Sequence, residues 1–399
     1  MLSYKVPVPI EELRLGMYVV ELDRPWIGTS FAFQGFPLVA EEQIEQLRKY
    51  CKSVYVDPER EAWSPEKRSA AEALQGTIPT RQDDVAVEDE FPLALEIHKS
   101  CEGALQQLLA STRGESEMDA AALTSAMTSM VHSIQRSPDA MVLLNAVRRK
   151  DTYELIRAMD TSILMVTFGR FLQFPVQRLE VLGLAGMLLD VGMTVLPDDV
   201  VAAFNSEDAV DTGLIETHVM HSVELIRAAR GLPARVDEIV ALHHERQDGE
   251  GYPYGLSSDQ ISIDGAVAAL VDSYSRLTST RPHAGQLSPS AALNLLHKQR
   301  GHAFDENLVE QFIQCIGVYP VGGTVELNTG ELAIVIGHNP ARRLQPRVSI
   351  VLDAQGNPLR PQKILDLMKQ PKTPDGETYR IRRALPKDGL IVDANEFLM

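Results

Sequence analysis

Apolar residues recur at helical spacing through most of the chain between residues 92 and 318, and this limits the fold more than any other feature. The segment "YELIRAMDTSILMVTFGRFLQF" shows the pattern, with one stripe formed by Tyr153, Arg157, Asp160, Leu164, Phe168 and Phe171. A period near 3.6 residues indicates amphipathic helices rather than strands. We therefore predict an almost wholly helical body, with connecting helices over residues 92–144 and the main helical domain over residues 145–318.

The two ends of the chain have a different pattern. Residues 1–57 alternate short strand-like runs with turns around one helical segment, "EEQIEQLRKY", which predicts a small α+β N-terminal domain. Residues 58–91 are polar and acidic, and we interpret them as a linker. From residue 319 to 399, runs such as "GTVELNTGELAIVIGHN" indicate hairpins and a small β-rich C-terminal extension. The predicted fold class is thus mainly α, a helical bundle with small β-containing units at both ends.

The composition excludes several classes of protein. The net charge of −17 disfavours binding to a nucleic acid polymer or to an anionic membrane surface. No run approaches the roughly 18 apolar residues of a membrane span, and the start lacks the apolar region of a signal peptide. The three cysteines are far apart and odd in number, so they form no disulfide framework. We expect a cytoplasmic protein with reduced thiols.

Five ionisable residues lie at positions that the helical pattern turns inward. His243 and His244 continue the apolar stripe of "RVDEIVALHHE", and His218 lies on a stripe of the preceding helical segment. Asp272 ends "DGAVAALVD", and Asp190 ends "LGLAGMLLD". A carboxylate in such apolar surroundings is costly unless it is paired. These residues therefore need partners inside the fold.

A metal ion would satisfy these residues together. Imidazole and carboxylate ligands suit iron, manganese or zinc, and a carboxylate that bridges two ions suits hydrolysis of a phosphate ester. The other interpretation is that the five residues are separate, each hydrogen-bonded in the core. The residues alone leave both interpretations open.

Three motifs resemble the signature of the HD-GYP domain. They are "HHERQDGEGYPYGL", "VDSYSRLTSTRP" and "GHAFDENLV", and the resemblance runs from about residue 145 to 318. The N-terminal "LRLGMYVVELDRPW" with the later "FQGF" resembles a small domain often fused ahead of HD-GYP domains in bacteria. The resemblance implies an HD-GYP-type helical bundle with a metal centre that hydrolyses cyclic di-GMP.

The resemblance also implies ligands and departures. One metal position is complete, with Asp190, His218, His243 and His244 as its ligands. The other retains only Asp190 and Asp272, which the resemblance also makes the catalytic carboxylates. The family's two remaining histidines are replaced by Arg157 and Leu189, and its phosphate-binding lysine by Met193. Downstream, Arg281 matches a basic residue that contacts the ligand phosphate.

These departures change the expected function. Arg157 supplies a fixed cation where a metal ion would bind, and it cannot generate hydroxide from a bound water. We expect either one divalent ion, iron or manganese, or none. The hypothesis is a catalytically weak or inactive protein that binds cyclic di-GMP or docks a signalling partner. The alternative is an active metal-dependent cyclic di-GMP phosphodiesterase.

The turn formed by Gly251, Tyr252 and Pro253 is intact. On its own it is a helix-stopping turn, because glycine breaks the helix and proline keeps the chain extended. The resemblance implies that it borders the site and contacts the ligand or a diguanylate cyclase (GGDEF) protein. An exposed tyrosine on such a turn would suit a contact surface, and both roles are compatible.

Overall fold

The structure is a computed structural model of the chain, and it divides into two compact units. One unit comprises residues 1–82 with 340–344, and the other residues 83–339 with 345–399. The residues that the structure describes are 6–14, 17–23, 36–38, 41–56, 85–112, 118–147, 153–205, 212–279, 287–339, 342 and 344–385.

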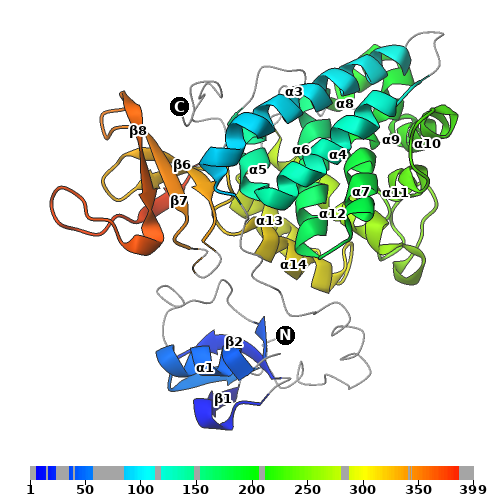
Figure 1. Ribbon diagram of the computed structural model, residues 1–399. Coiled ribbons are helices and arrows are strands. Elements are labelled where there is room, and N and C mark those ends of the chain that lie inside the picture. Colours follow the sequence, from blue (N-terminus) through cyan, green and yellow to red (C-terminus); the bar gives the residue numbers. More distant parts are fainter. Residues whose placement is uncertain are drawn as a thin grey trace. The chain divides into compact units, whose positions relative to one another are not determined.

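The N-terminal unit is a four-stranded antiparallel sheet packed against one helix (Figure 1). The strands are β1 (Val6–Pro9), β2 (Tyr18–Leu22), β3 (Phe36–Pro37) and β4 (Ser53–Val56), in the order β1-β4-β2-β3. The helix is α1 (Glu41–Tyr50), and a short 3-10 turn, η1 (Ile10–Glu12), follows β1. Ile44 and Leu47 of α1 share one core with Val19 and Val54 of the sheet. The α+β prediction for this end is confirmed.

The second unit is built mainly of helices (Figure 1). In chain order they are α3 (Val87–Thr112), α4 (Ala121–Arg136), α5 (Pro138–Val147), α6 (Tyr153–Phe171), α7 (Val176–Leu188), η3 (Val191–Val195), α8 (Asp198–Asn205), α9 (Thr212–Glu216), α10 (His218–Ala228), α11 (Val236–Ala241), η4 (Ser258–Gln260), α12 (Ile263–Thr278), α13 (Pro289–Lys298) and α14 (Glu306–Ile316). The predicted helical body is confirmed.

Helix α3 begins inside the range that the sequence assigned to a linker. It starts at Val87 rather than after residue 91, and its first turn contains Glu88, Asp89 and Glu90. Acidic side chains are favoured there because the first helical turn carries a partial positive charge. The acidic run that suggested a linker is therefore, at its end, the start of a helix.

Helices α6 and α7 approach each other closely enough to need glycine. A Cβ atom at Gly186 would lie 2.7 Å from the Cα of Ser162 on α6. Farther along, Phe168 of α6 packs edge-on against Phe312 of α14, with ring centroids 5.1 Å apart, and Tyr274 of α12 meets the same ring. These contacts hold α6, α7 and α12 together, and α6 and α12 carry Arg157 and Asp272.

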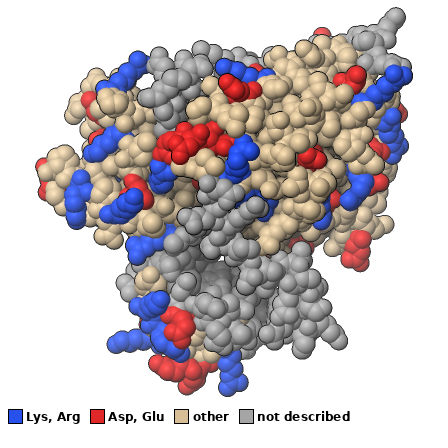
Figure 2. All heavy atoms as spheres, in the orientation of Figure 1, with Lys and Arg blue, Asp and Glu red and all other residues tan. Residues whose placement is uncertain are grey.

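A five-stranded antiparallel sheet follows the helices in the second unit. Its strands are β5 (Thr324–Leu327), β6 (Leu332–Gly337), β7 (Arg347–Leu352), β8 (Pro358–Asp366) and β9 (Ile381–Ala384), in the order β8-β7-β6-β5-β9. Arg347 pairs with Glu88 of α3, and the backbone N–H of His338 donates to Asp139 of α5 at 2.8 Å. Figure 2 shows basic side chains over this sheet on the face drawn. The predicted β-rich extension is confirmed.

None of the described helices combines the length and the apolar character that crossing a lipid bilayer requires.

The close approach of α6 and α7 predicts that Gly186→Ala lowers the free energy of unfolding by about 1–3 kcal/mol, as overpacking typically does. The matched control is Gly103→Ala on α3, where an added Cβ meets nothing within 4 Å. That change should stabilise the helix by up to about 1 kcal/mol. Urea denaturation of the full chain measures both, and equal effects would contradict the packing described.

Candidate metal centre

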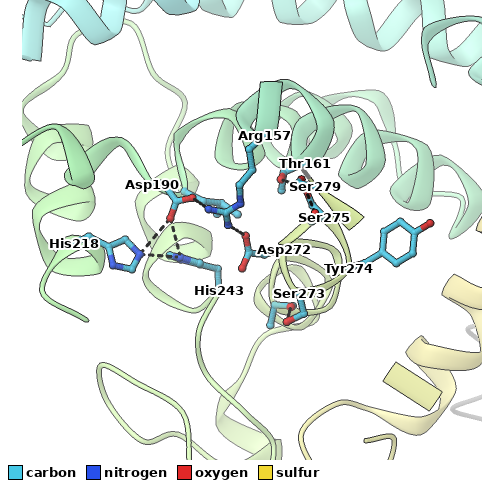
Figure 3. Close-up of polar contacts among 12 residues, drawn as sticks. Arg157, Thr161, Asp190, His218, His243, Asp272, Ser273, Tyr274, Ser275 and Ser279 are labelled. Carbon is cyan, nitrogen blue, oxygen red and sulfur yellow. Dashed lines mark hydrogen bonds and ion pairs between the residues drawn. The ribbon is translucent and has the colours of Figure 1, made fainter. Parts of the chain in front are cut away.

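Four ionisable side chains converge in the helical unit, and we call them the His/Asp cluster: Asp190, His218, His243 and His244. One ligand atom from each lies within 4.8 Å of every other. His218 opens α10, Asp190 precedes η3, and the two remaining histidines follow α11. Figure 3 shows Asp190 between His218, His243 and Arg157. All three histidines are buried.

Each Nδ1 atom of His218 and His243 donates one hydrogen bond to the backbone, and these two bonds fix the tautomers of the rings. Nδ1 of His218 donates to the carbonyl of Ile215 at 2.6 Å, and Nδ1 of His243 donates to that of Val240 at 2.6 Å. Because a carbonyl can only accept, each neutral ring keeps its proton on Nδ1 and presents a lone pair on Nε2. This arrangement is typical of metal-binding histidines, whose other ring nitrogen is held by a backbone carbonyl.

The lone pairs of the cluster face one another. The two Nε2 atoms are 3.4 Å apart, and Oδ1 of Asp190 lies 3.3 Å from Nε2 of His218 and 3.9 Å from Nε2 of His243. Oδ1 of Asp190 is buried and accepts no hydrogen bond. Acceptor atoms that face one another without a donor between them repel, and a cation among them would remove this repulsion. The cluster therefore fits a divalent ion, and its donors suit iron, manganese or zinc.

The ionisation states favour a metal ion over a bound proton. Burial lowers the pKa of His243 to about 4 and places the pKa of His244 well below its ordinary value. Burial alone would raise the pKa of Asp190, but the Arg157 guanidinium holds it well below the usual range. At neutral pH the cluster thus offers a carboxylate with neutral His243 and His244 rings, which are the forms that bind metals.

Arg157 bridges the two carboxylates that the sequence singled out. Its Nη1 donates to Oδ2 of Asp190, and its Nη2 donates to Oδ1 of Asp272. Burial alone would lower the pKa of Arg157, but the two carboxylates raise it above its ordinary value, so the guanidinium stays charged. The sequence prediction that Arg157 lies on the inward stripe agrees with this position. Figure 3 shows it reaching down from α6 between both acids.

Asp272 lies outside the group of four residues whose ligand atoms are all within 4.8 Å of one another, so its predicted role as a metal ligand stays a prediction. Its buried carboxylate is neutralised by Arg157, because the planar guanidinium fork can serve two carboxylates at once. Among the described residues, the structure thus brings together one group of potential metal ligands and places the Arg157 guanidinium beside it.

The loop that carries Asp190 is fastened to α10 by Ser222. The Ser222 hydroxyl donates to the carbonyl of Leu189 at 2.9 Å and accepts from the N–H of Gly192 at 2.8 Å. Leu189 is buried and apolar, and Met193 lies on η3 without a cationic group. Ser222 shares the helical stripe of His218, but nothing in the sequence indicates that its hydroxyl spans this loop.

The His-His pair lies just beyond a helix rather than within one. Helix α11 ends at Ala241, although the apolar stripe of the sequence predicted that it continues through His244. The chain turns because the buried carboxylate of Glu245 accepts from the N–H groups of Tyr254 at 2.7 Å and Leu256 at 2.8 Å. These bonds between the Glu245 side chain and backbone N–H groups fold the following turn back over His244. The periodicity of apolar residues carries no information about them.

The turn leaves no room for a side chain at Gly251, where a Cβ would lie 2.4 Å from the backbone N of Arg246. Tyr252 packs over His244, with ring centroids 4.6 Å apart, and is partly buried. This corrects the expectation of an exposed contact tyrosine at that position, since the exposed tyrosine is Tyr254. Pro253 is partly buried in the same turn. The predicted phosphate contact Arg281 lies outside the described residues.

Comparison with known proteins agrees with this geometry. The chain matches family profiles for a domain of unknown function (DUF3391) over residues 5–123, an HD domain over 108–308, and a KOW domain associated with HD domain over 324–373. It is 30% identical to a cyclic di-GMP phosphodiesterase of Pseudomonas aeruginosa, over 94% of this chain and 90% of that protein. It is 33% identical to 3'3'-cGAMP-specific phosphodiesterase 2 of Vibrio cholerae, over 33% of this chain and 25% of that protein.

The helical body and the His/Asp cluster define an HD domain. The chain belongs to the HD-GYP family, with its signature at the His-His pair and the turn that follows. A solved structure from Bdellovibrio bacteriovorus, described as an HDG"Y"P protein, aligns with a TM-score of 0.48 and 17% identity, over 78% of this chain and 99% of that one.

The single complete set of ligands predicts that the purified protein holds at most one divalent ion per chain. His243→Ala should weaken manganese binding by at least about 10–100-fold, the loss typical of removing even an outer-shell partner. The control is His221→Ala on α10, whose half-exposed ring pairs with Glu224 instead. Metal analysis and calorimetric titration measure both. Two ions per chain, or unchanged binding in His243→Ala, would contradict the site.

The bridging position of Arg157 predicts that Arg157→Leu lowers the free energy of unfolding by about 3–5 kcal/mol, because Asp272 is left as an unpaired buried charge. The matched control is Arg227→Leu, which removes an exposed ion pair with Asp237 and should leave the free energy of unfolding nearly unchanged. Denaturation in the presence of a chelator measures both. Similar losses in the two variants would show that Arg157 is not the counter-ion of buried acids.

Proposed function

We propose that this protein binds cyclic di-GMP over the His/Asp cluster and hydrolyses it weakly or not at all. The observation that carries the proposal is the Arg157 guanidinium between Asp190 and Asp272. The choice of ligand is supported by the Pseudomonas aeruginosa relative, a cyclic di-GMP phosphodiesterase similar along nearly its whole length. None of the three cysteines forms a disulfide bond, which supports a cytoplasmic location.

The weak activity follows from what an arginine can and cannot supply. Hydrolysis with two metal ions needs one ion to activate water and a second to stabilise the developing charge. Arg157 offers fixed positive charge and hydrogen bonds, but both of its Nη groups already donate to the two carboxylates. The apolar side chain of Met193 adds no cation near the phosphate. Loss of one stabilising group of this kind typically costs about 10²–10³ in rate.

The alternative is an active metal-dependent phosphodiesterase that uses one ion. The convergence of Oδ1 of Asp190 with the Nε2 atoms of His218 and His243 favours it. When bound there, a divalent ion supplies Lewis acidity and lowers the pKa of a bound water. Asp190, His218, His243 and His244 would hold the ion, and Arg157 would orient Asp190 through its second carboxylate oxygen.

Docking of a GGDEF protein is a further candidate, and the turn after the His-His pair favours it. The phenol ring of Tyr254 is exposed, and the backbone N–H of the same residue is fixed by Glu245. A rigid exposed aromatic residue loses little conformational freedom when a partner binds. Tyr254→Ala should therefore weaken partner binding while cyclic di-GMP binding is retained.

The proposal predicts that restoring the replaced residues raises activity. The double variant carries Arg157→His and Leu189→His, and the triple variant adds Met193→Lys. The wild type loaded with manganese or iron is the reference. We expect the triple variant to hydrolyse cyclic di-GMP at least about 100-fold faster than the wild type, in line with regained transition-state stabilisation. Release of the linear dinucleotide measures the rate.

The outcomes separate the candidates. Wild-type hydrolysis as fast as that of the triple variant would establish the active one-ion enzyme instead. Binding of cyclic di-GMP without hydrolysis supports the proposal. Wild-type protein that neither binds nor hydrolyses it would overturn the proposal and leave the docking role, which binding to a GGDEF protein then tests. Metal content of each variant is measured in parallel, so that a failed restoration is not mistaken for a failed hypothesis.

A further inference from the structure

Asp264 is a buried carboxylate outside the His/Asp cluster, and two arginines from separate segments of the chain bind it. Nε of Arg178 donates to Oδ1 at 2.7 Å, and Nη2 of the same guanidinium lies 2.7 Å from that oxygen. Nη2 of Arg235 donates to Oδ2 at 3.1 Å. The Asp264 side chain is 1% exposed, whereas those of Arg178 and Arg235 are 29% and 54% exposed. We call these three residues the Asp264 triad.

The Asp264 triad links α7 to α12, the two helices that lead to the carboxylates bound by Arg157. Arg178 lies in the first turn of α7, and Asp190 follows the end of that helix. Asp264 lies in the first turn of α12, eight residues before Asp272, which is about 12 Å along the helix axis. The two helices are therefore joined twice, once by Arg157 at the metal centre and once at their first turns.

The third member of the triad is joined to the His-His pair through α11. The carbonyl of Arg235 accepts from the N–H of Ile239 at 3.2 Å, and Val240 of the same helix binds Nδ1 of His243. The backbone of Arg235 is left-handed, with a φ of 75°, which is uncommon for a residue other than glycine. Such a conformation persists only where surrounding contacts hold it, and the bond to Asp264 is one of these contacts.

We propose that the Asp264 triad is a positioning element of the metal centre. It fixes α7 relative to α11 and α12, which pack against one another (Figure 1), and so sets the distances among the ligand atoms of the His/Asp cluster. Distances between a metal ion and its ligands hold within about 0.2 Å, so a small shift of one helix weakens binding. Like the proposed function, the inference places a divalent ion in the cluster, but it does not depend on the nucleotide.

The charges of the triad are the reverse of those at Arg157, and this makes the proposal testable. At Arg157 one guanidinium serves two carboxylates, whereas here one buried carboxylate serves two guanidiniums. Because both arginines of the triad are partly exposed, water can solvate them when the carboxylate charge is removed. Asp264→Asn keeps the shape of the side chain and leaves no unpaired charge in the core. We therefore expect this variant to fold.

The test compares Asp264→Asn with Glu90→Gln in the full chain. Glu90 is a matched control, because it is a buried carboxylate paired with the partly exposed Arg136, but it joins α3 to α4, which carry none of the cluster residues. Cobalt(II) is titrated into each protein, and calorimetry gives its affinity while the absorption spectrum of the bound ion reports the ligand geometry. We expect Asp264→Asn to bind cobalt about tenfold more weakly, the lower end of the loss typical for residues that orient metal ligands. Its spectrum should change, and Glu90→Gln should match the wild type in both measurements.

The spectrum separates positioning from loss of stability, because a variant that is only less stable binds less cobalt but in the same geometry. Unchanged affinity and spectrum in Asp264→Asn would overturn the inference and leave the proposed function standing. Equal losses in Asp264→Asn and Glu90→Gln would overturn it as well, since they would reflect general destabilisation. A wild type that binds no cobalt also overturns it, and cyclic di-GMP titrated into the same sample then decides the proposed function separately.

A second pair of variants keeps the test decisive if circular dichroism shows that Asp264→Asn is unfolded. Arg178→Gln removes one arginine of the triad, and its guanidinium, 3.6 Å above the ring of Phe174, is partly exposed rather than in the core. This variant should show the same loss of cobalt affinity and the same change of spectrum. Arg178→Lys, which keeps the positive charge, should recover part of the affinity. Equal binding by the wild type and Arg178→Gln would overturn the inference.

Discussion

The Arg157 guanidinium determines the arrangement of the site, because it holds together three separate parts of the chain. It leaves α6 and donates to Asp190 before η3 and to Asp272 on α12. A lysine at this position could approach both acids but could not direct one N–H group of a rigid plane at each of them. The position of Asp190 relative to His218 and His243 thus depends on a hydrogen bond from the opposite side. The same contact keeps the buried Asp272 from being an uncompensated charge.

Much of this architecture was predictable from hydrophobic periodicity, since it reports which side of each element is buried. The helical span of residues 92–318, the β-containing ends and the inward position of Arg157 all follow from it. The start of α3 was misjudged for a physical reason. Glu88, Asp89 and Glu90 make a segment polar, which resembles a linker, yet acidic residues are also favoured in the first turn of a helix. Composition alone does not separate these two cases.

The convergence of Asp190 with the three histidines agrees with the ligand set that the family resemblance implied. The hydrogen bonds that hold these four residues in place could not be predicted from the sequence. Ser222 spans the loop at Leu189, and Glu245 binds the N–H groups of Tyr254 and Leu256. Both side chains bind backbone groups, which every residue has, so no pattern of residue types in the sequence reveals these contacts. The end of α11 at Ala241 and the packing of Tyr252 over His244 depend on the same kind of bond. Sequence patterns indicate which residues face inward, and local hydrogen bonds decide where the chain turns.

The fixed tautomers of His218 and His243 have a consequence for how ligands of opposite charge affect one another. With both Nδ1 protons committed to carbonyls, the Nε2 atoms and Oδ1 of Asp190 form a surface of acceptors only. Phosphate oxygens are acceptors too, so on this side a nucleotide and an empty cluster repel each other. A cation in the cluster reverses the interaction, which makes the two binding events thermodynamically linked. Linkage is reciprocal, so whatever factor the cation adds to the affinity for the anion, the anion adds to the affinity for the cation.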